Sequence, residues 1–215
     1  MEMSTRIKAY KNSTTKPTIR HNSTTYRINN GGGDDDLPVF SKDLGRMIDV
    51  LEDCYRRFGR VLMVRVDLHT PLITANHADI SRFMKNFSRT IERKFNHRIG
   101  SVWCAEFHGD SKSVHYHLAL FLNGNTFRTA QKLKPIIRRL WEHPAGGYLA
   151  KFETEEQLGL KKKRHSMVIE SKDLLHEAIY WLSYLAKVRG KLARQKGSPD
   201  YRTSHIKPKN PKFTI

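Results

Sequence analysis

The chain has 215 residues, of which 39 are Lys or Arg and 21 are Asp or Glu, so its formal net charge at pH 7 is +18. This length supports one substantial hydrophobic core and argues against two similar domains. The excess of positive charge favours nucleic acid as the partner, because cationic side chains that neutralise phosphates release condensed counterions. The alternative is a basic surface that serves only solubility.

Two cysteines and the absence of long apolar runs exclude several classes of protein. Cys54 and Cys104 have no paired spacing, which argues against a disulfide scaffold or a zinc ribbon. No apolar run approaches membrane-spanning length, and the N-terminus has no signal-type apolar segment. We therefore expect a cytoplasmic protein without a membrane partner.

The chain divides into three expected regions. Residues 1–36 are rich in Ser, Thr, Asn, Lys and Arg and end in a Gly/Asp run, which is typical of a disordered basic arm with a flexible linker. Residues 37–193 contain the hydrophobic periodicity of a folded domain, and residues 194–215 form a polar tail. Contact between the basic residues of this arm and DNA is one interpretation. A disordered tail without a set role is at least as well supported.

Periodicity in the folded region alternates between helical and extended patterns. Helices are expected over 41–59, 76–97, 126–142 and 172–193, and strands over 61–69, 102–108 and 114–122, with possible strands over 148–152 and 166–170. A short polar turn over 109–113 predicts a hairpin between two of the strands. The pattern indicates an α+β domain with an antiparallel sheet and helices packed mainly on one side.

The hairpin strands carry a candidate metal site. Alternation places His115 and His117 on one face of the second strand, and Glu106 on the matching face of the first. Two imidazoles and one carboxylate suit Mn²⁺ or Mg²⁺, with positions left open for phosphate oxygens and water. Asp67 and His108 are less favoured as additional or supporting groups. The alternative is that these histidines are ordinary surface residues of the strand.

The last helix carries a candidate nucleophile. Tyr180, Tyr184 and Lys187 fall at i, i+4 and i+7, nearly opposite the apolar stripe of the helix. A tyrosine can attack a phosphodiester and conserve its energy in a covalent link, while a lysine offsets the developing charge. The helical pattern is equally consistent with ordinary surface residues of an amphipathic helix.

Two further groups of basic residues are candidate DNA contacts. Arg65 and Asp67 share the polar face of the strand expected over residues 61–69, whose opposite face is apolar. A basic run lies in the ambiguous stretch between residues 147 and 170, where a solvated loop is the usual interpretation; its members are Lys161, Lys162, Lys163 and Arg164.

These motifs together resemble the HUH endonucleases, which are named for histidine, hydrophobic residue, histidine. The resemblance rests on Glu106, on His115-Tyr116-His117 with the following residues 118–123, and on Ser183-Tyr184-Leu185-Ala186-Lys187. Within that superfamily the chain is most similar to the rolling-circle replication initiators of filamentous phages (inoviruses) and their prophage relatives. The similarity extends over about residues 38–193.

The resemblance implies a ferredoxin-like or RNA-recognition-motif-like sheet of HUH type that nicks single-stranded or extruded origin DNA. The tyrosine would become linked to the 5′ phosphate and leave a 3′ hydroxyl that primes rolling-circle replication. Two tyrosines four positions apart also match initiators that use both, with Tyr184 favoured for the first cleavage. Because the chain is too short to include a helicase, a host helicase and DNA polymerase in the bacterial cytoplasm are implied partners.

Other functions remain open at this point. A prophage regulator that binds DNA without catalysis is the leading alternative, and a single-strand transposase or relaxase is a related one. An RNA-binding module is less favoured, because no stretch of exposed aromatic residues of the expected type is present. The sequence assigns no oligomeric state.

Overall fold

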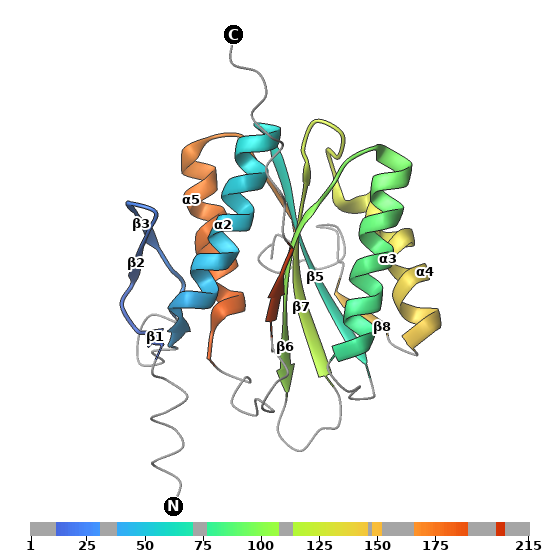
Figure 1. Ribbon diagram of the computed structural model, residues 1–215, viewed down its shortest axis with the longest axis horizontal. Coiled ribbons are helices and arrows are strands. Elements are labelled where there is room, and N and C mark those ends of the chain that lie inside the picture. Colours follow the sequence, from blue (N-terminus) through green and yellow to red (C-terminus); the bar gives the residue numbers. More distant parts are fainter. Residues whose placement is uncertain are drawn as a thin grey trace, which may run out of the picture.

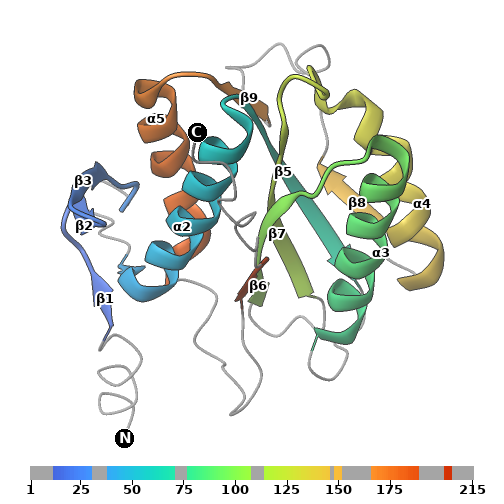
Figure 2. The same ribbon diagram turned by 45° about the horizontal axis from the view of Figure 1, so that its top comes forward.

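The computed structural model describes residues 12–30, 38–70, 77–107, 114–145, 148–151, 166–188 and 201–204. Within these ranges an antiparallel sheet lies between two layers of helices (Figure 1 and Figure 2). The α+β class predicted from the sequence is confirmed.

Six strands form the central sheet, in the order β10-β6-β7-β5-β8, with β9 also paired to β5. The long central strands are β5 (Val61–Thr70), β6 (Gly100–Phe107) and β7 (Val114–Asn123). The outer edge of β5 has two short partners: β9 (Ser166–Ile169) pairs with residues 61–64, and β8 (Tyr148–Lys151) with residues 67–69. Arg65 therefore lies between the two partner strands. The short β10 (Tyr201–Thr203) pairs with β6 at the other edge.

Helices cover both faces of the sheet. On one face lie α2 (Ser41–Phe58), α5 (Lys172–Leu182) and the 3₁₀ turn η3 (Ser183–Ala186). On the other lie α3 (Ala78–Phe95), the 3₁₀ turn η2 (Ala130–Leu133) and α4 (Lys134–Ala145) (Figure 1). None of the helices in the described ranges combines the length and apolarity needed to cross a lipid bilayer.

This two-sided arrangement corrects the expectation of helices mainly on one side. The reason is that the central strands are apolar on both faces over much of their length. Leu62 and Val64 pack in the α3/α4 core, whereas their neighbours Val61 and Met63 pack in the α2/α5 core. Near-continuous apolar runs of this kind are typical of strands that are covered on both sides.

The segment 12–30 is folded, whereas the sequence predicts a disordered arm over residues 1–36. β1 (Ser13–Thr14) pairs with β4 (Val39–Phe40), and β2 (Thr18–His21) forms a hairpin with β3 (Thr24–Arg27). Polar pairs attach the hairpin to α2: His21 Nε2 lies 2.7 Å from Asp49 Oδ1, and the Tyr26 hydroxyl donates to Glu52. Tyr26 and Ile28 also pack into the α2/α5 core. Two buried residues among polar neighbours are too few to establish a hydrophobic period, so the sequence does not predict this docking. Residues 1–11 and 31–37 lie outside the described ranges.

The C-terminal region contains one described segment. Residues 201–204 add β10 to the sheet, and the Ser204 hydroxyl accepts a hydrogen bond of 2.8 Å from the Ser101 amide. The sequence predicts only a polar tail over 194–215, because three residues are too few to establish a period. The other residues of that tail lie outside the described ranges.

The docked hairpin leads to a prediction about stability. Tyr26 is only 3% exposed, so Tyr26→Ala should remove buried contacts and lower the free energy of unfolding by roughly 2–4 kcal/mol. Thr25→Ala, at the neighbouring exposed position, should change it by less than about 0.5 kcal/mol. Chemical denaturation measures both values. Equal, negligible effects would mean that the hairpin does not dock on α2 in solution.

Candidate functional site

The α2/α5 face of the sheet becomes polar towards one end. There β5 contributes Asp67 and His69, β7 contributes His115 and His117, and β6 contributes Glu106. The strand register places Asp67 opposite His117, and both His69 and Glu106 opposite His115. Side chains at directly opposed positions of adjacent strands share a face, so the register gathers these groups at one place.

His117 is held between two carboxylates. Its Nδ1 lies 2.7 Å from Asp67 Oδ1, its Nε2 lies 3.1 Å from Glu106 Oε2, and its side chain is 12% exposed. Burial alone would lower the pKa of this imidazole, but the hydrogen bonds and charges of the two carboxylates outweigh burial and raise the pKa from 6.5 to about 9. The ring is therefore protonated at neutral pH and donates from both nitrogens.

Asp67 is ionised by the same arrangement. Burial would raise the pKa of this carboxyl, but His117 and Arg65 stabilise the charged form and lower the pKa from 3.8 to about 2. Arg65 Nε donates to Asp67 Oδ1 at 3.1 Å, and Arg65 Nη2 lies 3.3 Å from His117 Nδ1. Two cations and two anions thus meet at the centre of the site.

The three predicted metal ligands come together only in part. His115 packs against His69 with tilted rings whose centroids are 3.7 Å apart, while Glu106 and His117 contact each other directly. Among the described residues, no group of three or more His, Cys, Asp or Glu side chains has the spacing of a metal site. The 3.1 Å between Glu106 and His117 fits two ligands of one cation, since atoms ~2.1 Å from an ion at right angles are ~3 Å apart.

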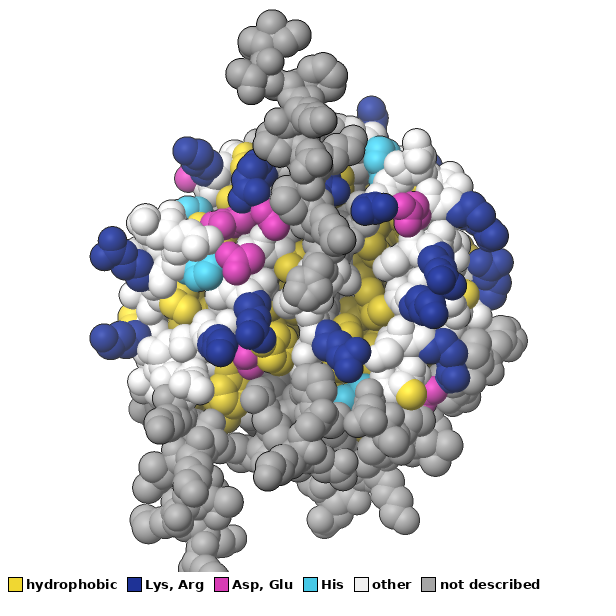
Figure 3. Space-filling model, in the orientation of Figure 1, with side chains coloured by type: hydrophobic (Ala, Val, Ile, Leu, Met, Phe, Trp, Pro, Cys, Tyr) yellow, Lys and Arg dark blue, Asp and Glu magenta, His cyan; other side chains and the backbone are white. Residues whose placement is uncertain are grey.

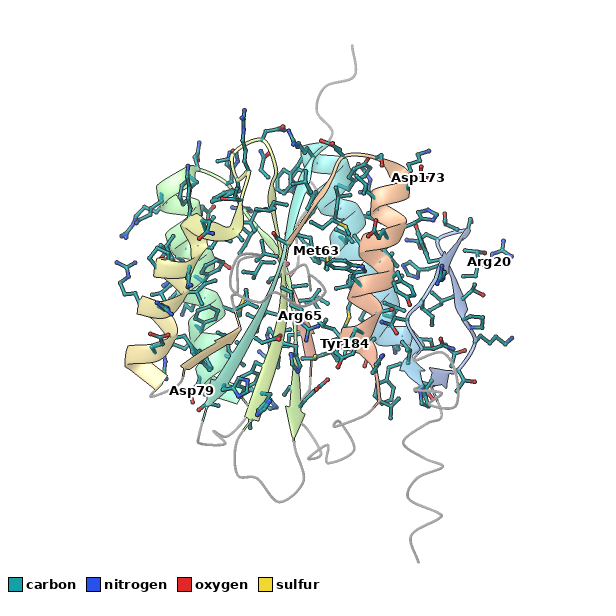
Figure 4. The ribbon with its side chains drawn as sticks, turned by 180° about the vertical axis from the view of Figure 1, so that it is seen from behind. Arg20, Met63, Arg65, Asp79, Asp173 and Tyr184 are labelled. Atoms are coloured by element: carbon teal, nitrogen blue, oxygen red, sulfur yellow. The ribbon has the colours of Figure 1, made fainter. Side chains whose placement is uncertain are left out.

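Tyr184 and Lys187 lie beside this cluster. The Arg65 guanidinium is 5.1 Å from the centroid of the Tyr184 ring, and Lys187 Nζ is 4.3 Å from it. Arg65 and Tyr184 approach each other from β5 and from the end of α5 (Figure 4). Lys187, at 6% exposure, is buried. The aromatic face interacts favourably with both cations, which fixes the ring relative to the sheet.

Tyr180 points to a different neighbour. Its ring lies 5.0 Å from the Arg27 guanidinium of β3, so it faces the N-terminal hairpin. The helix expected over 172–193 ends at Leu182, where the Ser183 hydroxyl donates to the Tyr180 carbonyl at 2.7 Å and a 3₁₀ turn follows. Tyr180 and Tyr184 therefore do not continue one regular α-helical stripe, and Lys187 has an extended backbone.

Some predicted residues lie outside the described ranges, namely His108, Lys161, Lys162, Lys163 and Arg164. The segment that contains the basic run leaves the sheet at Lys151, opposite Asp67, and returns at Ser166, opposite Val64. Its two ends thus flank Arg65 on the edge of β5.

Sequence reasoning missed two features of the site. It did not assign His69 a partner, although the strand register places it opposite His115. It also missed the contact between the Asn29 amide and the Ser183 hydroxyl, 2.8 Å long, which joins the N-terminal segment to the turn before Tyr184. The alternation of β5 contained the signal for the pairing of His69 with His115. No local sequence pattern indicates the contact between Asn29 and Ser183.

A family model described as the YagK/YfjJ C-terminal domain matches residues 33–198. The matched range includes the central strands β5 to β9, both helical layers and all the candidate site residues, whereas β1, β2, β3 and β10 lie outside it. The family is found in prophage-associated proteins. No curated protein and no solved structure matches the chain.

The protonated His117 leads to a prediction about pH. With EDTA present, the stabilisation from its carboxylate partners should be complete below pH 6.5 and should be lost as the pH rises through about 9. The free energy of unfolding should fall by roughly 2–3 kcal/mol over that window. Denaturant titrations at fixed pH values measure this loss.

Variants separate this effect from other titrations. His117→Gln should lack the alkaline loss, whereas the exposed His176→Gln should retain it. In acid the direction is opposite, because the contribution of Asp67 is present above pH 3.8 and is lost as the pH falls towards 2. An alkaline profile that is identical in the wild type and His117→Gln would contradict the assignment.

Proposed function

The chain belongs to the YagK/YfjJ C-terminal domain family, and we propose that it is a DNA-nicking enzyme that attacks single-stranded or extruded DNA with a tyrosine. The observation that carries the proposal is the position of Arg65. Its guanidinium contacts Asp67 and lies beside His117 on one side and the Tyr184 ring on the other. A carboxylate–histidine cluster and a tyrosine are thereby joined at one place.

A divalent cation, Mn²⁺ or Mg²⁺, fits the donor chemistry of this cluster. Glu106 and His117 would hold it, with His115 the next donor along β7. Such an ion would polarise the phosphodiester and offset its negative charge. His117 must lose its Nε2 proton before that nitrogen can act as a ligand. Its Nδ1–H bond to Asp67 would then orient the neutral ring, as carboxylates commonly do for ligating histidines.

Tyr184 is the proposed nucleophile. Its hydroxyl would release its proton to water as the oxygen forms a bond to phosphorus and the bond from phosphorus to the 3′ oxygen breaks. The 3′ oxygen would take up one proton from water and leave as a 3′ hydroxyl, so no net proton is consumed. The product is a 5′-phosphotyrosine link that conserves the energy of the phosphodiester. Arg65 and Lys187 place two positive charges at the ring, where they would offset the negative charge of the transition state.

Tyr180 is the less suitable nucleophile in this conformation. The guanidinium of Arg27 lies over its ring, and β3 packs alongside α5. Its proposed role is either strand transfer after the hairpin moves or ordering of the substrate by stacking. In the cell the nick would start rolling-circle replication by a host helicase and DNA polymerase, or strand transfer of the transposase or relaxase kind.

One observation favours a second candidate function, a non-catalytic DNA-binding regulator. The cluster of Arg65, Asp67, Glu106 and His117 pairs two cations with two anions and forms a charge-balanced structural unit by itself. A protein that used this cluster only for stability would bind DNA without cleaving it. Formation of a covalent adduct distinguishes the two functions.

The identity of the nucleophile is tested by removing single hydroxyl groups. Tyr184→Phe should reduce the covalent adduct with a single-stranded oligonucleotide and Mn²⁺ by at least roughly 10³-fold, because Phe retains the ring but lacks the attacking oxygen. Tyr180→Phe is the matched control and should still form the adduct. Gel electrophoresis and peptide mapping of the adduct provide the measurement.

An adduct mapped to Tyr180 in the wild type would reverse the assignment. If neither tyrosine carries an adduct while the DNA is cleaved, the covalent mechanism is wrong. Binding without cleavage under all metal conditions would favour the regulator instead.

The metal-binding residues are tested separately. His117→Ala, His115→Ala and Glu106→Ala should each abolish nicking, because the cation would be held weakly or not at all, but should leave most of the DNA affinity, which depends on many basic residues. His176→Ala on the exposed face of α5 controls for the loss of a histidine. Cleavage with and without EDTA, together with binding isotherms, measures both effects. Unchanged cleavage rates in all three variants would place the chemistry elsewhere.

A further inference from the structure

The two helical layers differ strongly in charge. In the layer formed by α3, η2 and α4, α3 has five Lys or Arg against two Asp or Glu, and η2 with α4 has four against one. In the opposite layer, α2 has four against four and α5 has one against two. The positive charge of the helices is therefore concentrated on the face of the sheet that lies opposite the candidate site.

Cations on α3 form a regular exposed row. Lys85, Arg89 and Arg93 recur every fourth residue, which places them along one side of the helix at intervals of ~6 Å. Arg138 and Arg139 are exposed on α4, the other helix of this layer. Lys and Arg side chains are prominent over this side of the molecule (Figure 3). We call this surface of α3, η2 and α4 the basic face.

A groove borders the basic face where α3 meets the β6/β10 edge of the sheet. It has a volume of about 260 Å³, and Lys85 approaches it from α3 while Arg202 approaches from β10. Hydroxyl groups also line it, from Ser81 and Ser88 on α3 and from Ser101 and Ser204 on the sheet edge, together with the apolar side chains of Met84 and Trp103. Cations and hydroxyls are the groups that bind the phosphate oxygens of a nucleic acid backbone.

We propose that the basic face is a docking surface for double-stranded DNA, distinct from the proposed nicking site on the other face of the sheet. On the described parts of α3, η2 and α4 the aromatic side chains are buried except that of Phe95, which is half-buried and packs against the core. Single strands are usually bound by stacking bases on aromatic rings, whereas a duplex presents mainly its phosphates. The surface would hold a duplex that adjoins the single-stranded segment at the candidate site.

Charge reversal on the two layers tests the proposal. Lys85→Glu/Arg89→Glu changes the basic face, and Lys42→Glu/Lys172→Glu makes the same change in net charge on exposed positions of α2 and α5. Fluorescence anisotropy with a blunt duplex of about 20 base pairs, in EDTA and over a range of KCl, measures affinity and salt dependence. The basic-face variant should bind at least roughly tenfold more weakly, and the slope of log K against log salt should decrease by about 2.

The control variant should remain within roughly threefold of the wild type, with thermal unfolding confirming that both variants are folded. Equal losses in the two variants would show a nonspecific effect of net charge and would overturn the proposal. So would unchanged binding in the basic-face variant, or basic-face-dependent binding that is tighter for a duplex RNA of equal length. Basic-face-dependent duplex binding by a protein that nicks no oligonucleotide would support the docking surface and reject only the nicking function.

Discussion

The polar end of the sheet depends on a buried imidazole held between two carboxylates. Without a positive charge on His117, Asp67 and Glu106 would be two anions on the same face of the sheet with too little compensation. The three residues belong to β7, β5 and β6, so the interaction also requires the register of three strands. A shift of one residue in β7 would turn His117 to the α3/α4 side and place Leu118 between the carboxylates. The site and the sheet pairing are thus mutually dependent.

Period-two alternation was sufficient to predict the three long strands β5, β6 and β7 and the groups that share their polar end, because the pleat directs every second side chain to the same face. Alternation alone does not predict the second helical layer; the signal for it is the continuous apolar run 118–122, whose residues belong to both cores. The sequence also does not predict that Tyr180 and Tyr184 face different neighbours. This difference depends on Ser183, whose hydroxyl bonds to Tyr180 and Asn29 as the helix changes to a 3₁₀ turn. That arrangement involves residues 154 positions apart.

The sheet separates two chemical environments. The α2/α5 side combines a nearly neutral helical layer with a concentrated group of charges at the strand ends, which suits recognition of one phosphate at a defined position. The α3/α4 side has dispersed cations around a largely apolar core that includes Trp141 and Phe87, which suits the proposed contact with an extended polyanion. Because β6 borders the groove with Trp103 and supplies Glu106 to the site, the two environments share one strand and cannot shift independently.

The divided edge of β5 allows the connection between β8 and β9 to vary in sequence and length. Residues 152–165 join two short strands that are anchored on the same edge, at Asp67 and at Val64. The entropy cost of closing a connection between two fixed ends grows only logarithmically with its length. Insertions, deletions and substitutions there would leave the pairing of the long strands intact. Both anchors flank Arg65, so each altered connection would still start and finish beside the same guanidinium.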